Sequence, residues 1–244
     1  MACAVLLIST IALGLTALSL WNGTQAAPTP APTATETTPS NDRTVQGLPI
    51  DVTSSLALDD FALTELGSSY AFLYATATYN GTGDAATVFY DVTAYAEDGT
   101  ILDRTPASLY MLPGQTSMLE AIFSQDISDV ARFAIEQTYD ERDAPVLTGE
   151  LVVDAADVSD GGRVDASLTS ALSATAEYTD LYLVAYTEGE IYGVCTDFVD
   201  IAAGASFESY CYLEAAWNET LIDVEGDVPD DVEVKVYASY DLPW

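Results

Sequence analysis

A regular alternation of strand-like and turn-like segments over residues 70–118 is the feature that most constrains how this chain folds. Apolar residues recur at every second position from Val88 to Ala94, and polar residues such as Asp91 and Thr93 stand between them. Because successive side chains of a strand point to opposite faces, a period of two is typical of a half-buried β-strand. The segment therefore predicts a strand with one face in a core.

Two turns divide this stretch. Glu-Asp-Gly at 97–99 and Leu-Pro-Gly-Gln at 112–115 separate the predicted strands. Glycine permits the positive φ of a tight reversal, and proline has a fixed φ that suits the turn position before the glycine. Short strands joined by turns of this kind predict an antiparallel β-sandwich. A further strand over 131–139 is expected to point Phe133, Ile135 and Tyr139 to one face.

Aromatic residues occupy alternate positions of another predicted strand, at Tyr70, Phe72 and Tyr74. Exposed tyrosines can form a recognition surface, because the ring is apolar and the hydroxyl is polar. Apolar residues at a period of two are, however, typical of a sandwich core. We therefore expect these three side chains in the core.

The first half of the chain resembles the FxLYD-type immunoglobulin-like extracellular domains of bacteria and archaea. The resemblance rests on TATYNGTG at 76–83, on YAEDGTIL at 95–102 and on the Pro-Gly turn at 112–115. It is clearest over residues 70–118 and implies a secreted or anchored β-sandwich with no settled activity. No catalytic residue is carried over by the resemblance.

A weaker repeat of the same pattern predicts a second domain. LYLVAY at 181–186 corresponds to FYDVTAY at 89–95, and VEVKVYASYD at 232–241 corresponds to ARFAIEQTYD at 131–140. In the second copy TEGE at 187–190 replaces the acidic Asp-Gly turn, so this copy has diverged. We interpret the pattern as a tandem duplication of an immunoglobulin-like β-sandwich.

The domain boundaries follow from this repeat and from breaks in composition. We expect domain 1 at 47–143 and domain 2 at 144–244, with the polar run at 140–145 between them. The length of 244 residues suits two sandwiches of about 100 residues each. Because 49% of the residues are hydrophobic, the chain has enough apolar material for two cores.

The charge of the chain is strongly negative. The sequence has 39 acidic and 6 basic residues, which gives a formal net charge of −33, and it contains no histidine. Nucleic acid is excluded as a partner, because its binding depends on Lys and Arg that displace counterions. The acidic residues are spread along the whole chain, so we interpret them as a solvated, salt-adapted surface, with binding of cations or of a cationic partner as the alternative.

The N-terminal residues 1–26 are interpreted as a signal peptide or a transmembrane anchor. Residues 2–21 contain neither charge nor proline. About 20 such residues can span a bilayer, whereas the apolar region of a signal peptide has about 7 to 15. Thr24-Gln25-Ala26 before Ala27 resembles a cleavage site, so both interpretations stay open. Cys3 precedes the apolar run and is assigned as a small apolar residue.

Residues 27–46 are rich in proline and threonine and show no hydrophobic periodicity. Such a segment cannot bury apolar surface and extends by about 3 Å per residue where polyproline II dominates. We expect a stalk that holds the folded part away from a surface. Its threonines are candidates for O-glycans, although many Pro/Thr spacers carry none.

Cys195 and Cys211 are the sharpest local signal. The segments 191–201 and 207–213 are predicted strands, and the turn Ala202–Ala205 lies midway between the cysteines. If these strands pair as one hairpin, the cysteines face each other, and a disulfide is expected. The alternatives are two buried free thiols or a metal pair, and the metal pair lacks the histidine or further cysteines that such sites use.

No motif in the sequence predicts catalysis. Nucleophilic catalysis needs a base beside the nucleophile, most often histidine, and this chain has none. Two carboxylates can replace it, as in glycosidases, but among 39 acidic residues any pair can be chosen. We therefore expect no enzyme and no catalytic residues.

Two acidic loops are candidates for calcium, since calcium prefers six to eight oxygen ligands. Neither loop has EF-hand spacing, and the alternative is a solvated loop between strands. We otherwise expect no cofactor. The candidate ligands in the first loop are Asp154, Asp157, Asp160 and Asp165, and those in the second are Asp223, Glu225, Asp227, Asp230 and Asp231.

Three asparagines lie in Asn-x-Thr, the acceptor pattern for N-glycans. These are Asn22, Asn80 and Asn218. Asn80 and Asn218 fall in predicted loops and are the glycosylation candidates, provided that the source cell has an N-glycosylation system.

The sequence as a whole favours a non-enzymatic cell-surface or secreted protein with an interaction or structural role. Its expected partners are other proteins at the cell surface or in a membrane complex, and the membrane itself if residues 2–21 are retained. One alternative is a single-span accessory subunit of a membrane complex. The other is a module that binds calcium or a small ligand.

Overall fold

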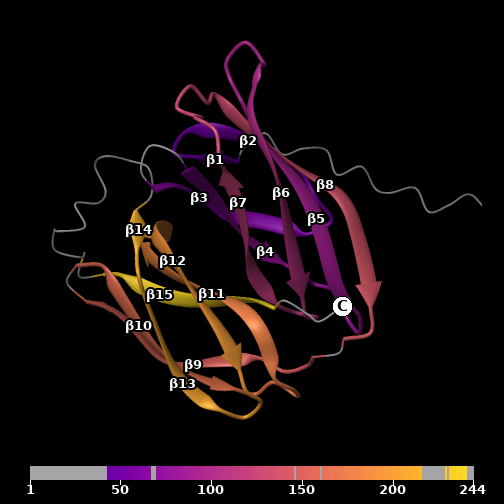
Figure 1. The fold of residues 1–244 in the computed structure, drawn as a ribbon, viewed down its shortest axis with the longest axis vertical. Coiled ribbons are helices and arrows are strands. Elements are labelled where there is room, and N and C mark those ends of the chain that lie inside the picture. The colour runs from indigo at the N-terminus through magenta and orange to yellow at the C-terminus, as the bar shows by residue number, and fades with distance from the viewer. Residues whose placement is uncertain are drawn as a thin grey trace, which may run out of the picture. The chain divides into compact units, whose positions relative to one another are not determined.

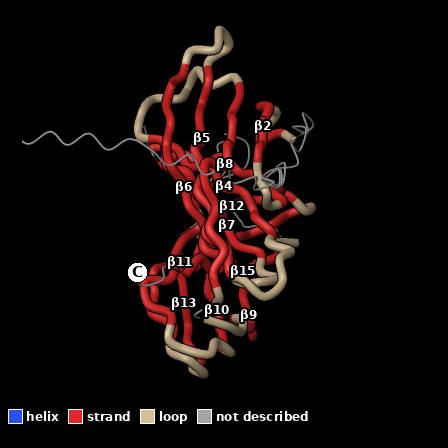
Figure 2. The backbone as a smooth tube through the Cα atoms, turned by 90° about the vertical axis from the view of Figure 1, so that its right-hand side faces the viewer, coloured by secondary structure: helices blue, strands red, loops and turns tan. Residues whose placement is uncertain are grey.

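A computed structural model describes residues 43–66, 70–145, 147–159, 161–215, 229 and 231–240. The predicted anchor at 1–26 and most of the predicted stalk lie outside these residues. Thr37–Trp244 form one compact unit. The described part of this unit is all-β, as predicted, and strands make up most of its backbone (Figure 2). No helix that could cross a membrane occurs among the described residues.

The first half contains two sheets (Figure 1). One has the order β1-β2-β8-β5-β6 and the other the order β3-β4-β7. Strands β2 and β8 pair in parallel, whereas the other pairs of this half are antiparallel. The strands are β1 (Thr44–Val45), β2 (Leu48–Thr53), β3 (Ala57–Leu66), β4 (Tyr70–Thr78), β5 (Ala85–Tyr95), β6 (Ile101–Met111), β7 (Thr116–Phe123) and β8 (Arg132–Asp143).

The second half also contains two sheets, with the orders β13-β10-β9 and β14-β12-β11-β15. All their pairs are antiparallel. The strands are β9 (Leu151–Ser159), β10 (Arg163–Ser170), β11 (Ala176–Thr187), β12 (Glu190–Ile201), β13 (Ser206–Tyr212), β14 (Glu214–Ala215) and β15 (Glu233–Tyr240).

The two halves share one order of strands. The sheet β3-β4-β7 corresponds to β9-β10-β13, and the run β6-β5-β8 corresponds to β12-β11-β15. Segments that match in the sequence occupy equivalent places, because 89–95 lies in β5 and 181–186 lies in β11. Each of these strands is paired on both sides in its sheet. That the halves are separate immunoglobulin-like domains stays a prediction.

Three buried clusters lie between the sheets. Within the first half, one cluster joins the inner faces of its two sheets and includes Tyr90, Phe123 and Phe133. A second does the same in the second half around Leu168 and Leu183. The third joins the outer face of β3-β4-β7 to the outer face of β11 and β12, and its members are Ala62, Tyr74, Met118, Tyr182, Val184, Tyr186, Ile191 and Val194. The four sheets thus form successive packed layers.

The predicted strand and turns of the first half are confirmed. Val88, Val92 and the other alternate apolar residues of β5 are buried. Gly99 has φ +83° and donates its N–H to the carbonyl of Ala96. Gly114 has φ +77° in the turn where Gln115 donates to the Leu112 carbonyl. These positive φ values explain why glycine stands at both turns.

Two predictions of burial are wrong. Tyr139 is 55% exposed, because Phe89 pairs with Tyr139 while Tyr90 pairs with Gln137, and the resulting β-bulge reverses the alternation. Tyr70 is also exposed. Tyr74 is buried, as expected, but it belongs to the cluster between the two halves rather than to a sandwich core.

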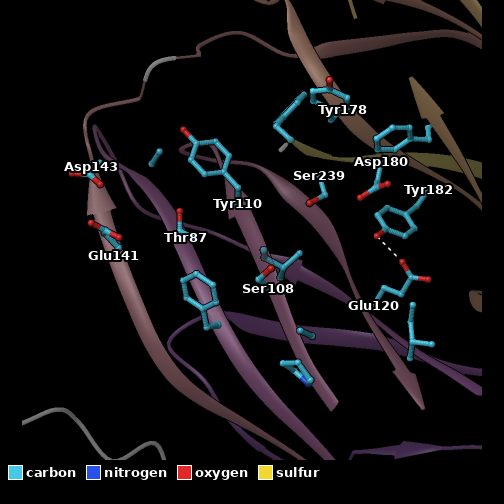
Figure 3. A pocket seen from close by; sticks show the side chains of 18 of the residues that line it. Thr87, Ser108, Tyr110, Glu120, Glu141, Asp143, Tyr178, Asp180, Tyr182 and Ser239 are labelled. Carbon is cyan, nitrogen blue, oxygen red and sulfur yellow. Dashed lines mark hydrogen bonds between the residues drawn. The ribbon is translucent and has the colours of Figure 1, made fainter. Parts of the chain in front are cut away.

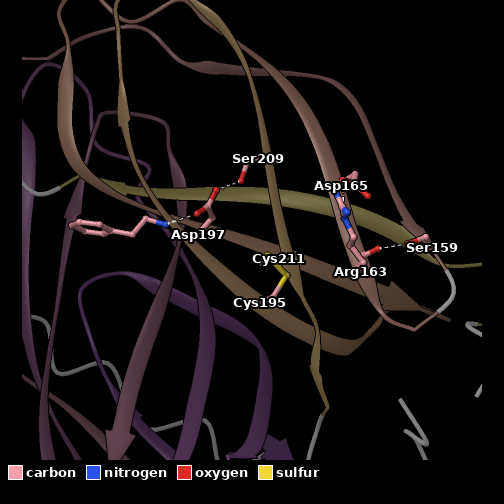
Figure 4. The surroundings of a disulfide bond; sticks show 8 residues. Ser159, Arg163, Asp165, Cys195, Asp197, Ser209 and Cys211 are labelled. Atoms are coloured by element: carbon pink, nitrogen blue, oxygen red, sulfur yellow. Dashed lines mark hydrogen bonds and ion pairs between the residues drawn. A yellow bond between two sulfur atoms is a disulfide. The ribbon is translucent and has the colours of Figure 1, made fainter. Parts of the chain in front are cut away.

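The disulfide between Cys195 and Cys211 is present, but the predicted hairpin is wrong (Figure 4). Strand β12 pairs with β11 and β14, whereas β13 pairs with β10. The turn Ala202–Ala205 therefore carries the chain from one sheet to the facing sheet. The disulfide bridges these sheets, with a Cα–Cα distance of 5.7 Å. The two cysteines face each other in the predicted hairpin and also between the two facing sheets. The cysteine pair was therefore predicted correctly, although the strand pairing was not.

Candidate functional site

A cavity of about 920 Å³ opens where the two halves meet (Figure 3). Strands β5, β6, β7 and β8 line one side, and β11, β12 and β15 line the other. This volume lies within the range of about 300–1,000 Å³ that is usual for small-molecule sites. Its acidic lining residues are Glu120, Glu141, Asp143 and Asp180, and its aromatic ones are Phe89, Tyr110, Tyr178, Tyr182, Phe198 and Tyr240.

Glu120 reaches the cavity because of the alternation in β7. Leu119, Ala121 and Phe123 face the first core, so Glu120 points to the opposite side, toward the second half. Its carboxylate accepts hydrogen bonds from the hydroxyls of Tyr74 (3.3 Å) and Tyr182 (3.0 Å). The second bond crosses between the halves and is visible in Figure 3.

Burial dominates the electrostatics of this carboxylate. It raises the pKa of Glu120 above its usual value, and the nearby charge of Asp180 raises it further. The two tyrosine hydroxyls act in the opposite sense, because they stabilise the ionised form. Burial and the carboxylate of Glu120 together raise the pKa of Tyr182 well above 10. Glu120 and Tyr182 are thus a coupled acid pair at the wall of the cavity.

The negative character extends to the other side of the cavity. Glu141 and Asp143 lie at the end of β8, and Asp180 lies on β11 across from them (Figure 3). Burial raises the pKa of Tyr110, and the charge of Asp143 raises it further. None of the described residues that line the cavity is Lys or Arg. A concave wall of one sign concentrates ions of the other sign.

An exposed aromatic pair borders the cavity. The rings of Tyr178 and Phe198 lie 5.9 Å apart, and their side chains are 56% and 61% exposed. Tyr178 has φ +53°, an unusual conformation for a residue with a side chain, at a bulge between Ala176 and Thr179. Its N–H donates to the Asp200 carboxylate at 2.9 Å, which holds the bulge in place.

Hydrogen bonds between the halves keep the two walls together. The carbonyl of Ala238 accepts from the Gln115 amide at 2.8 Å and from the Ser117 hydroxyl at 2.6 Å. The Tyr186 hydroxyl of the second half donates to the Asp60 carboxylate of the first half at 3.5 Å. Because these groups are buried or half-buried, breaking the bonds would leave polar atoms unsatisfied. The two walls are therefore joined by bonds that are costly to break.

The predicted calcium loops are only partly within the described residues. Asp154 and Asp157 lie on β9, and Asp165 lies on β10. Asp154 accepts a hydrogen bond from Thr169, and Asp165 pairs with Arg163. Asp231 is described and accepts from Thr187. The remaining candidates, Asp160, Asp223, Glu225, Asp227 and Asp230, lie outside the described residues. In the described part, no three His, Cys, Asp or Glu side chains gather as a group that could hold a metal ion.

Of the glycosylation candidates, Asn80 is exposed in the loop after β4. Asn218 and Asn22 lie outside the described residues. The cavity was not predicted from the sequence. The one local signal of the cavity was Glu120, an acidic residue among the apolar residues of 118–123, since a charged side chain is costly to bury in an apolar core.

Comparison with family models gives no match for this chain, and comparison with curated proteins gives none. Among solved structures, the chain is similar to a transglutaminase from red sea bream, with 10% sequence identity and a TM-score of 0.21. The match covers 67% of this chain and 27% of the transglutaminase. A likeness of this size decides neither the fold nor the activity.

Proposed function

We propose that this chain is a non-enzymatic protein that works outside the cytoplasm and displays two immunoglobulin-like β-sandwiches for interaction with other proteins. The disulfide between Cys195 and Cys211 carries this proposal. Disulfides form and persist in secreted and surface proteins and are rare where thiols are kept reduced. The apolar segment at 2–21 and the Pro/Thr-rich segment at 27–46 agree with export and presentation on a stalk.

Two features of the fold support the display of paired sandwiches. The shared strand order of the two halves fits a duplicated immunoglobulin-like domain. The cluster around Tyr74 and Tyr182 packs the halves against each other. An interface that is apolar and hydrogen-bonded restricts domain motion. The two halves would therefore act as one rigid unit and not as two domains on a flexible linker.

The rival to display is an accessory subunit that keeps its apolar helix among partner helices. The test is to purify the protein from native membranes and to search for peptides of residues 2–21 by mass spectrometry. Retention of these peptides with stoichiometric membrane partners would favour the accessory subunit. Their absence, or retention without such partners, is the result that display predicts.

A second candidate function, binding of a small ligand, is favoured by the cavity between the halves. Ligand sites are typically concave, pre-formed and placed at domain interfaces. The test is a panel of neutral and charged small molecules, read out by the thermal stability of the purified protein. A ligand that binds only the folded state raises the melting temperature. If no compound does so, this second function is rejected.

A further inference from the structure

We propose that the cavity binds an organic ammonium or guanidinium ion through its carboxylates and aromatic rings. This inference rests on the second candidate function and names the ligand chemistry of that site. The cation can belong to a free small molecule or to a Lys or Arg side chain of a partner, and the experiment below separates these two sources.

The described lining of the cavity is acidic, because it contains four acidic residues from three strands and no basic residue. The chain has 6 Lys and Arg residues in total, and most are already engaged elsewhere. Arg104 pairs with Asp91, and Lys235 lies 4.3 Å from the centre of the Tyr186 ring. Among the described residues, no Lys or Arg forms an ion pair with Glu141 or Asp143, so a ligand can balance these two charges.

The protein holds several of its own cationic side chains in the same way. Three arginines are each held by one aspartate and one tyrosine ring. Arg163 pairs with Asp165 at 2.5 Å and lies 4.5 Å from the Tyr210 ring centre. Arg132 does the same with Asp51 and Tyr95, and Arg142 with Asp140 and Tyr79. A carboxylate together with the face of an aromatic ring is therefore the recurrent way in which this structure binds a guanidinium group.

The cavity supplies the same two groups, carboxylates and aromatic rings, without a cation from the chain. Asp143 and Tyr110 line one side of the cavity (Figure 3). Across the cavity, the adjacent rings of Tyr178 and Phe198 are more than half exposed. Cation–π attraction to such rings strengthens when the site is partly shielded from water.

The cavity, at about 920 Å³, is far larger than a hydrated metal ion needs, and the exposed side chains of Ile122 and Pro106 add apolar surface to its lining. These residues would contact the hydrocarbon part of a ligand while the carboxylates contact its charge. An organic cation matches both features, whereas an inorganic ion matches only the second.

The experiment measures binding to the folded full chain by isothermal titration calorimetry at constant ionic strength. The probes are phenethylammonium, its neutral analogue 2-phenylethanol, and a tetralysine peptide with blocked ends. We expect phenethylammonium to bind roughly tenfold more tightly than 2-phenylethanol, because only the cation gains the carboxylate and ring contacts. Selective binding of tetralysine over phenethylammonium would assign the cation to a partner protein.

The variants use residues at the open edge, so that folding is preserved. Glu141→Gln with Asp143→Asn, and separately Phe198→Ala, are expected to weaken cation binding at least several-fold. The matched controls are Asp59→Asn and Tyr212→Ala, which remove an exposed acid and an exposed ring outside the cavity. Far-ultraviolet circular dichroism checks that each variant is folded.

Three results would overturn the inference. If 2-phenylethanol binds as tightly as phenethylammonium, the site recognises apolar surface and not charge. The proposed binding of a small ligand would then stand, but the preference for a cation would not. An equal loss in Asp59→Asn would assign the binding to diffuse surface charge. No binding of either cationic probe would reject the ligand class, and the neutral compounds of the panel above would then decide whether the cavity binds ligands at all.

Discussion

Removal of the disulfide is the perturbation with the most calculable effect. Cys195→Ala with Cys211→Ala opens a cross-link between residues 16 positions apart. In the chain-entropy model, a closed loop of about 15 residues stabilises the folded state by about 3 kcal/mol. The bond joins two sheets that share no strand pairing with each other. We therefore expect the free energy of unfolding to fall by about 3 kcal/mol.

For a cooperative unit of about 200 residues, a loss of 3 kcal/mol lowers Tm by roughly 6–12 °C. Guanidinium denaturation of the oxidised protein and of the double variant, at one pH and salt concentration, measures the difference. The reduced wild-type protein is the control, since it loses the bond without losing the sulfur atoms. A destabilisation below about 1 kcal/mol would refute the loop-closure argument. Alkylation of both cysteines in the native, unreduced protein would refute the bond itself.

Three further predictions concern charge and backbone. Glu120→Gln should stabilise the protein at pH 7. Burial raises the pKa of Glu120 in the folded state, so the wild-type protein loses stability as the pH rises through that pKa, and the variant does not. Urea melts should therefore show a gain over wild type at pH 7 that vanishes near pH 4. A gain that is independent of pH would contradict this. Gly149→Ala should destabilise the folded protein by more than about 1 kcal/mol, because Gly149 has φ +100° and an added Cβ would lie 2.2 Å from the Ala171 carbonyl oxygen. A melting temperature equal to that of the wild-type protein would disprove this. With a net charge of −33, sodium chloride should raise Tm progressively, and calcium at constant ionic strength should add nothing; a calcium-specific rise of several degrees would instead identify a site.

Local patterns predicted the strands and turns of the first half well. The alternation in β5 and the glycines at 99 and 114 depend on neighbouring residues only, and the structure has them as expected. The cysteine pair was also predictable, because Cys195 and Cys211 are equally far from one turn. The sheet to which each strand belongs could not be predicted in the same way. A turn that reverses the chain within a sheet and a turn that crosses to the facing sheet can have the same spacing and the same inward pattern.

Contacts between distant segments explain the remaining errors. The bulge that exposes Tyr139 depends on pairing with β5 and leaves no mark in the sequence of β8. The interface between the halves did leave a signal, since LYLVAY at 181–186 is apolar at every position and therefore suits a strand buried on both faces. The cavity had the weakest signal. Its walls come from seven strands, and only the fold brings Glu120 and Asp180 close together.

The most direct test of the proposed role is protease accessibility on intact source cells. Arg43 is the first Lys or Arg of the chain, and the next is Arg104 on β6. Display on a stalk predicts that trypsin added to unbroken cells releases a fragment beginning at Thr44, or that the protein is already in the medium. If the protein stays with the cells and is cut only after they are lysed, it faces the cytoplasm and the account is wrong.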